Sequence, residues 1–115
     1  MNKKFKIELL GEAIDFVESL DDKTREKILY NARKAQLVND PELFKKLNDL
    51  IWELRTKYNK NQYRLLAFWD KTENEETLVL ATHGFIKKRQ KTPKGEIKKA
   101  EEIRKEYFEH KNKGL

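Results

Sequence analysis

A short basic segment follows the only histidine in the middle of the chain. The sequence HGFIKKRQKTP, residues 83–93, begins at His83, where an apolar run stops, and contains four basic residues: Lys87, Lys88, Arg89 and Lys91. Such side chains release condensed counterions when they neutralise phosphates, so a localised basic surface favours a polyanionic partner. The alternative is a lysine-rich segment that is simply solvated.

The net charge of the chain is concentrated in the same region. The formal charge is +6 at pH 7. Residues 1–82 contain 15 Lys plus Arg against 15 Asp plus Glu, whereas residues 83–115 contain 11 against 5. The first part is therefore neutral, and the whole excess lies in the last 33 residues.

Two arginines in the preceding segments are expected to reach the same surface, because side chains alternate between the two faces of a strand. One face, toward the helices, would hold Trp52, Leu54, Leu65, Trp69 and Leu80. The other would gather Arg55, Arg64 and His83, followed from beyond the last strand by Lys87 and Lys88. A slip of one residue in the strand register would scatter this set.

Each of these residues also has a simpler structural interpretation. Arg55 and Arg64 can pair with Glu53 as ordinary strand charges. His83 precedes a glycine and can be a turn residue with no part in proton transfer. Tyr107 is expected to be a core contact of the last helix rather than a platform on which a base stacks.

The segments before this surface predict a strand, two helices and a connector. FKIELL, residues 5–10, alternates as a short strand. Helical spacing of apolar residues then predicts two helices that form a hairpin joined near LDDKT, residues 20–24. In NDPELFKKLND, residues 39–49, Asp40 as a cap and Pro41 at the first helical position predict at most two helical turns.

The rest of the chain predicts a sheet and a final helix. Residues 51–58, 61–70 and 76–86 are rich in aromatic and aliphatic residues, and their short links predict an antiparallel meander. Thr92 as a cap and Pro93 as the first helical residue then begin a helix that packs through a stripe containing Ile97, Ala100 and Tyr107. The expected fold is a small α+β domain over residues 1–115, in which a first strand and a helical hairpin pack on the meander.

Composition excludes several functional classes. The chain has no cysteine and only two histidines, which removes thiolate catalysis and leaves a metal site without support. The N-terminal residues mix acidic residues into the apolar ones, so no signal peptide is expected, and the apolar runs are far shorter than the roughly 20 residues of a membrane helix. We expect a cytoplasmic protein without a cofactor.

A family resemblance rests on three motifs in order. They are ELR at residues 53–55, YR at 63–64, and HGFIKKRQKTPKGEIKKA at 83–100. Together they resemble the RelE/ParE superfamily of bacterial toxins, and most closely its HigB-like, phage Gp49-like branch. The similarity covers about residues 51–107, and the first half of the chain agrees in layout. The resemblance implies a RelE-like fold, in which the elements have the layout that periodicity predicts.

The resemblance also implies a function and its partners. RelE-like and HigB-like members are toxins of type II toxin-antitoxin pairs that cleave messenger RNA, commonly in the ribosomal A site. A small antitoxin neutralises them, and in the HigB-like branch this partner usually carries a helix-turn-helix DNA-binding domain, as in HigA. We therefore expect a metal-independent endoribonuclease that inhibits translation.

The implied chemistry is attack of a ribose 2′-hydroxyl on the adjacent phosphate. Arg64 and Arg55 would hold the phosphate oxygens, and Lys87 or Lys88 would add charge. A lysine crowded by other cations can also have its pKa lowered enough to take part in proton transfer. His83 is the candidate general acid or base, because histidine titrates near neutrality. The residues expected to bind RNA are Lys88, Arg89 and Lys91, with Tyr63 or Phe85 stacking on a base.

Two other functions remain open from the sequence. ParE-like members of the superfamily poison DNA gyrase and cut no RNA. A non-catalytic nucleic-acid-binding module would use the basic segment only to contact phosphates. The combination of Arg55, Arg64, His83 and the two lysines favours the nuclease.

Overall fold

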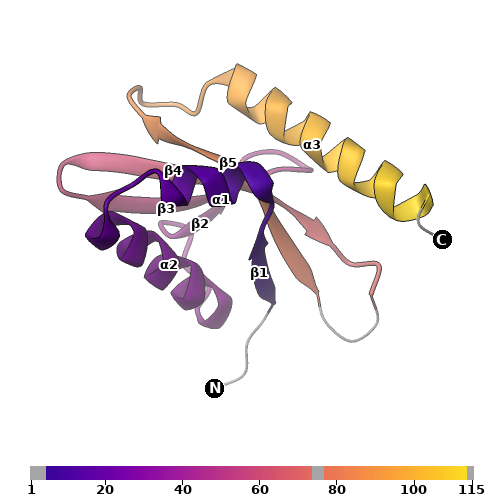
Figure 1. Ribbon diagram of the computed structural model, residues 1–115, viewed down its shortest axis with the longest axis horizontal. Helices are drawn as coiled ribbons and strands as arrows, with labels where there is room; N and C mark the ends of the chain where they lie inside the picture. Colours follow the sequence, from indigo (N-terminus) through magenta and orange to yellow (C-terminus); the bar gives the residue numbers. More distant parts are fainter. Residues whose placement is uncertain (1–4, 74–76, 114–115) are drawn as a thin grey trace.

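A five-stranded mixed sheet forms the centre of the molecule (Figure 1). The structure is a computed structural model that describes residues 5–73 and 77–113. The strand order is β1-β5-β4-β3-β2; β1 runs parallel to β5, and the other neighbours are antiparallel. Along the chain the elements are β1 Lys6–Leu9, α1 Gly11–Glu18, α2 Asp22–Leu37, β2 Phe44–Lys46, β3 Trp52–Tyr58, β4 Asn61–Asp70, β5 Leu78–Lys87 and α3 Lys94–Lys113.

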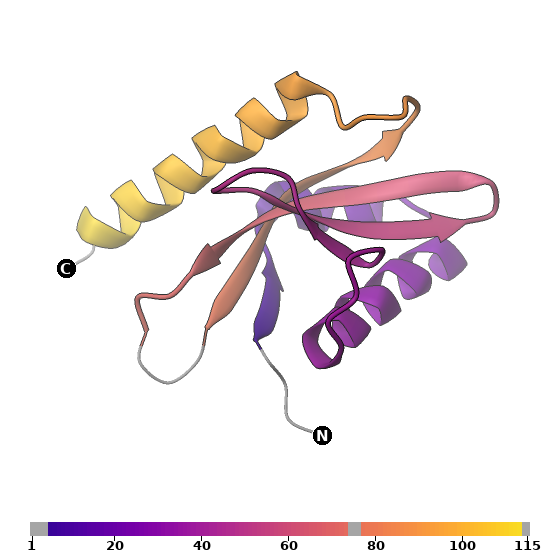
Figure 2. The same cartoon turned by 180° about the vertical axis from the view of Figure 1, so that it is seen from behind.

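Each face of the sheet has its own apolar core. Residues of α1 and α2, such as Val17 and Ile28, pack with Leu54 and Leu65 on one face. On the other face, Ala100 of α3 packs with a cluster that includes Phe68. Figures 1 and 2 show α1 and α2 beside each other and α3 running apart from them. The expected α+β domain is confirmed, with a strand, two helices, a meander and a final helix.

The helical hairpin is fixed by a cap and by one close contact with the sheet. The Asp21 side chain accepts a hydrogen bond from the Thr24 backbone N–H (2.8 Å), which caps the first turn of α2. Gly84 of β5 lies against the ring of Phe16, and a Cβ added at Gly84 would lie 2.2 Å from the Phe16 Cδ2 atom. Glycine therefore lets this part of β5 approach the Phe16 ring closely.

A two-residue turn sets the register of β3 and β4. Asn59 and Lys60 both have positive φ, 51° and 69°, as a type I′ hairpin turn requires. The strands that it joins are in register from the Tyr58–Asn61 pair onward, which places Arg55 directly opposite Arg64. The turn expected between these strands is thus the feature that brings the two arginines together.

A β-bulge in β5 changes which of its side chains face α3. Leu66 pairs with His83 but Ala67 pairs with Ala81, so Thr82 is an extra residue. Strict alternation grouped Leu80 with the α1–α2 face, and this expectation is wrong: Leu80 packs on the α3 face. The shift of one residue at the bulge nevertheless leaves His83 on the same face as Arg64.

Two local expectations also need correction. The segment after Asp40 forms one turn and then the edge strand β2 rather than a short helix, because Phe44 is buried and its ring packs on Phe5 and Trp52. The last helix begins at Lys94, and the Thr92 hydroxyl donates a hydrogen bond to Glu53. In the first case packing with distant residues replaces the expected helix, and in the second the helix begins one residue later than expected.

The stripe expected on the last helix is confirmed. Ala100 is fully buried, and Ile97 and Tyr107 pack on the same core cluster. Tyr107 is a core contact, as expected, since its ring lies 5.2 Å from the Phe68 ring. Among the helices in the described ranges, none combines the length and the apolar character that crossing a bilayer requires.

Candidate nucleic-acid interface

A polar pocket opens on the part of the α3 face that is near the β3–β4 hairpin. Its volume is about 320 Å³, at the lower end of the range for small-ligand pockets. We call it the arginine pocket; it is lined by Glu42, Arg55, Lys57, Gln62 and Arg64. Four of these residues alternate along β3 and β4, which is why their side chains reach the same face.

A buried carboxylate, Glu53, contacts both arginines of the arginine pocket. Glu53 is 2% exposed and lies on the same face of β3 as Arg55. Its Oε1 atom is 3.2 Å from the Nε of Arg64 and 3.6 Å from the Nε of Arg55, and its Oε2 atom accepts the hydrogen bond from Thr92. The alternative interpretation of the arginines as partners of Glu53 is therefore correct as a description of their contacts.

The Arg64 guanidinium is held on three sides. It donates to the Gln62 Oε1 atom (2.6 Å) and to the Tyr63 carbonyl (3.1 Å), and its Nε forms the ion pair with Glu53. Burial lowers the pKa of Arg64 below its ordinary value, and Glu53 opposes this shift. A guanidinium nevertheless stays charged in proteins, so Arg64 is a fixed cation at the base of the pocket.

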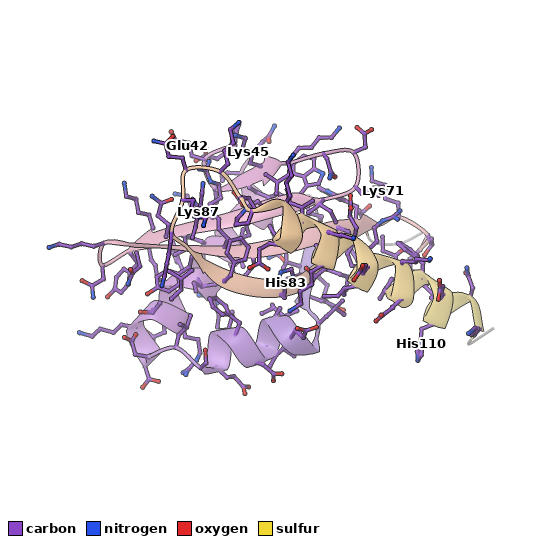
Figure 3. The ribbon with its side chains drawn as sticks, turned by 90° about the horizontal axis from the view of Figure 1, so that it is seen from above. Glu42, Lys45, Lys71, His83, Lys87 and His110 are labelled. Carbon is purple, nitrogen blue, oxygen red and sulfur yellow. The ribbon has the colours of Figure 1, made fainter. Side chains whose placement is uncertain are left out.

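Arg55 and Lys87 place further charge around Arg64. The Arg55 side chain is 28% exposed and thus reaches solvent. Burial lowers the pKa of Lys87, and the positive charges of Arg64, Arg55 and Lys45 lower it further, while Glu53 raises it. Figure 3 shows Lys87, Lys45 and Glu42 on one side of the molecule. The region thus holds five cations against the carboxylates Glu42 and Glu53.

The segment that links β5 to α3 supplies the other expected RNA-binding residues. Lys88, Arg89 and Lys91 are exposed, and Thr92 at the end of this segment is bound to Glu53. Phe85 is directly opposite Arg64 on β4, is partly exposed, and lies on the same face. Its position suits an aromatic group beside a phosphate site.

Two expected site residues lie elsewhere. Tyr63 is 6% exposed and packs in the core on the α1–α2 face, away from Arg64. His83 is 3% exposed; its Nε2 atom lies 3.0 Å from the Glu96 Oε1 of α3, and its Nδ1 atom lies 3.0 Å from the Thr82 hydroxyl. Burial lowers the pKa of His83, and Glu96 opposes the shift. His83 thus joins β5 to α3 and is covered.

Some residues of the site were not singled out from the sequence. Lys57 and Gln62 follow the same alternation as Arg55 and Arg64, so the strand pattern contained them. Lys45 depends on β2, which the sequence did not indicate, and Thr92 looked like a helix cap. The missing signal in these two cases was a pairing between distant segments.

The arrangement can hold an anion with two planar donors and additional ammonium charge. Guanidinium groups from neighbouring strands present several N–H donors in a fixed geometry, which matches phosphate oxygens. Within residues 5–73 and 77–113, no group of three or more His, Cys, Asp and Glu side chains is placed to bind a metal ion. Fixed cations such as Arg55 and Arg64 can stabilise negative charge on phosphorus.

Comparison with known protein families agrees with this architecture. A family model described as Phage derived protein Gp49-like (DUF891) matches residues 15–105, and so includes the second half of α1 and all of α2 as well as the motifs of the second half. None of the curated proteins matches the chain at a significant level. The family match extends well beyond half of the sequence, and the chain therefore belongs to the phage-derived Gp49-like family, a RelE/HigB-like toxin branch.

Proposed function

We propose that this protein is the toxin of a type II toxin-antitoxin pair and a metal-independent endoribonuclease. It cuts messenger RNA in the cytoplasm, in the ribosomal A site, and so inhibits translation. Its partner is a small helix-turn-helix antitoxin of the HigA kind. Family membership supports the toxin role in general, and the arginine pocket supports the choice of RNA as the substrate.

The proposed reaction breaks one phosphodiester bond. The ribose 2′-oxygen attacks the adjacent phosphorus, its proton is removed, and the 5′-oxygen leaves and receives a proton. The products are a 2′,3′-cyclic phosphate and a free 5′-hydroxyl. Negative charge develops on a five-coordinate phosphorus, so fixed cations lower the barrier.

The pocket residues have distinct roles in this reaction. Arg55 and Arg64 hold the non-bridging oxygens, and Phe85 stacks on a neighbouring base. Lys87 has a lowered pKa because it is partly buried among cations, and we assign proton transfer to it. Lys88, Arg89 and Lys91 contact the RNA backbone on either side.

His83 and Tyr63 have no direct contact with RNA in this proposal. His83 is covered by α3 and engaged with Glu96, and Tyr63 faces the other core. A general base must come within hydrogen-bond reach of the proton that it removes. We therefore give His83 a role in the packing of α3 rather than in proton transfer.

The observation that carries the proposal is the pairing of Arg55 with Arg64 above Glu53. Two like charges directly opposite on adjacent strands are normally unfavourable. Glu53 offsets part of this repulsion, but it is one carboxylate shared by two guanidinium groups. A bound phosphate would supply the missing negative charge.

The test is induced expression of the wild type and of Arg55→Ala. Arg55 is partly exposed, and its removal leaves the Arg64–Glu53 ion pair in place. We expect the wild type to stop growth and cut messenger RNA within translated regions, and the variant to lose both effects. Lys34→Ala is the matched control, because it removes one positive charge from the exposed side of α2 and should change neither.

Two results would contradict the nuclease. Growth arrest with intact messenger RNA and failed gyrase-dependent supercoiling would indicate a ParE-like inhibitor. RNA binding without cleavage by the purified wild type, on or off the ribosome, would indicate a binding module. Co-expression with a helix-turn-helix protein encoded next to the toxin gene should restore growth.

A further inference from the structure

A second basic hollow lies at the other end of β2. Its volume is about 330 Å³, similar to that of the arginine pocket. We call it the tryptophan hollow; it is lined by Lys46, Asp49, Leu50, Trp52, Trp69, Lys71 and Arg104. None of its lining residues belongs to the arginine pocket, and the proposed cleavage chemistry does not use them.

Three cations from separate elements converge on the tryptophan hollow. Lys46 belongs to β2, Lys71 follows β4, and Arg104 belongs to α3. The one carboxylate in the lining, Asp49, is fully exposed and lies 3.8 Å from the Lys46 ammonium. Such an excess of positive charge in a hollow favours an anionic occupant.

Two indole rings form an aromatic surface beside these cations. Trp52 and Trp69 are partly exposed, and their rings meet edge to face with centroids 5.5 Å apart. The Lys71 ammonium lies 5.4 Å from the Trp69 ring centroid. The Trp69 Nε1 atom is buried and has no hydrogen-bond partner among the described residues. Cations beside aromatic rings are the usual composition of a single-strand nucleic-acid surface.

β2 connects the two pockets. Lys45 and Lys46 are consecutive and point to opposite faces: Lys45 pairs with Glu53, and Lys46 pairs with Trp52. Lys45 thus faces the region of Arg64 and Lys87, while Lys46 lines the tryptophan hollow. In Figure 3, Lys45 and Lys71 lie on the same side of the molecule. A single RNA strand that runs across the sheet edge at β2 can therefore contact both pockets.

We propose that the tryptophan hollow binds an unpaired nucleotide of the same RNA strand that is cut at the arginine pocket. A base stacks on Trp52 or Trp69, and Lys46, Lys71 and Arg104 bind the flanking phosphates. This inference rests on the proposed function, since it takes RNA as the substrate. An acidic peptide would also neutralise the cations, but it would leave the exposed indole surface without a stacking partner.

Intrinsic fluorescence gives a direct test, because the chain contains two tryptophans and both line this hollow. The probe is a single-stranded RNA of about ten nucleotides, a length that single-strand grooves cover. Its riboses are all 2′-O-methylated, so the proposed reaction cannot occur. We expect saturable quenching of tryptophan emission by this RNA and no matching change with poly-glutamate at the same charge concentration.

The charge contacts are tested with Lys46→Ala/Lys71→Ala. We expect weaker binding and a slope of log K against log salt that is smaller by about 1.4, since each phosphate contact on a single strand contributes about 0.7. The matched control is Lys23→Ala/Lys34→Ala, which removes two exposed lysines of α2 and should keep the wild-type slope. All four lysines are exposed, so these variants should fold.

The outcomes separate this proposal from the nuclease. The unmethylated RNA of the same sequence is incubated in parallel, both free and bound to ribosomes, to follow cleavage. Cleavage with binding but without quenching, or an unchanged salt slope in Lys46→Ala/Lys71→Ala, overturns the tryptophan hollow and leaves the nuclease standing. Quenching with a reduced slope but no cleavage supports the hollow and contradicts the nuclease. Stronger quenching by poly-glutamate than by RNA would identify an acidic peptide as the occupant.

Discussion

Two buried carboxylates on the same face of the sheet have opposite surroundings. Asp70, at the end of β4, is fully buried and accepts hydrogen bonds from the Tyr107 hydroxyl (2.6 Å) and the Lys111 ammonium (2.8 Å) of α3, and from Thr72. Glu53, on β3, is nearly as buried, but the arginines that it pairs with extend into an open pocket.

We interpret the contacts around Asp70 as a structural network and those around Glu53 as the binding network of the proposed function. The groups around Asp70 all donate hydrogen bonds to it. Burial raises the pKa of Asp70, but the hydrogen bonds from Lys111, Thr72 and Tyr107 outweigh burial and hold this pKa well below the ordinary value. The pKa of Tyr107 rises to about 12 because of burial and the hydrogen bond to Asp70. Around Glu53, cations outnumber carboxylates. A satisfied network stabilises the fold, whereas an unbalanced one can take up a ligand.

The largest expected effect comes from Arg64→Ala. The variant leaves Glu53 buried with the longer contact to Arg55 and the hydrogen bond from Thr92. Breaking a buried ion pair on one side typically destabilises by about 3 to 5 kcal/mol. We expect a loss of this order in the free energy of unfolding, measured by urea denaturation, together with complete loss of RNA cleavage.

A second substitution separates stability from activity in this variant. In Glu53→Gln/Arg64→Ala the buried side chain is neutral, so most of the stability should return. Cleavage should remain absent, because the guanidinium proposed to hold the phosphate is still missing. Recovery of cleavage in the double variant would show that Arg64 only supports the fold.

Asp70→Asn should produce the converse result. Hydrogen bonds to a charged group contribute about 1.5 to 3 kcal/mol, so we expect a loss of about 2 kcal/mol in stability near neutral pH. Cleavage should be unchanged at temperatures where the variant is folded, because the contacts between Asp70 and α3 lie outside the arginine pocket. Lost cleavage in a folded variant would contradict the division into two networks.

The pH dependence of stability tests the same carboxylate. The folded pKa of Asp70 lies below its ordinary value of 3.8, so the unfolded chain binds the proton first as the pH falls. The stabilisation that ionised Asp70 contributes is complete above pH 3.8, the ordinary value, and is lost as the pH falls through and below it. Unfolding curves of Asp70→Asn should therefore vary less with pH in this range than those of the wild type.

A smaller effect is expected at Lys87. Because its pKa is lowered, Lys87 should lose its charge at a lower pH than an ordinary lysine, whose value is 10.5. The affinity of the wild type for non-cleavable RNA should thus fall as the pH rises toward this value. Lys87→Arg keeps the charge and should keep the affinity, while cleavage should decrease if Lys87 transfers the proton. Equal pH dependence of the two proteins would contradict this assignment.

The arginine pairing was predictable from the sequence because two local patterns agree. Alternation placed Arg55 and Arg64 on one face, and the short link between the strands required a tight hairpin. The α1–α2 hairpin and the α3 stripe were likewise predictable from periodicity. Each of these features depends on residues close in sequence.

The sequence patterns are insufficient where distant residues decide the structure. The bulge at Thr82 places Leu80 on the α3 face instead of the α1–α2 face, and no local sequence pattern indicates this bulge. β2 forms because Phe44 completes an aromatic cluster, although Asp40 and Pro41 resemble a helix start. The burial of His83 depends on where α3 crosses the sheet, which periodicity along α3 does not specify. Tertiary packing overrides local preference in each case.

His83→Gln tests whether His83 has a structural role or a catalytic one. If His83 only links β5 to α3, a glutamine amide can keep the hydrogen bond to Glu96, and cleavage should change by far less than the roughly hundredfold lost with a proton-transfer group. His110→Gln, at an exposed position of α3, is the control.

Stability should report the role of His83 independently of activity. Burial lowers the pKa of His83 in the folded state, so the unfolded chain binds a proton first as the pH falls below 6.5, and the wild type should lose stability there. His83→Gln removes this dependence and His110→Gln does not. A large loss of cleavage in His83→Gln without a change in the pH profile of stability would return His83 to the catalytic group, and α3 would then have to move before RNA could reach it.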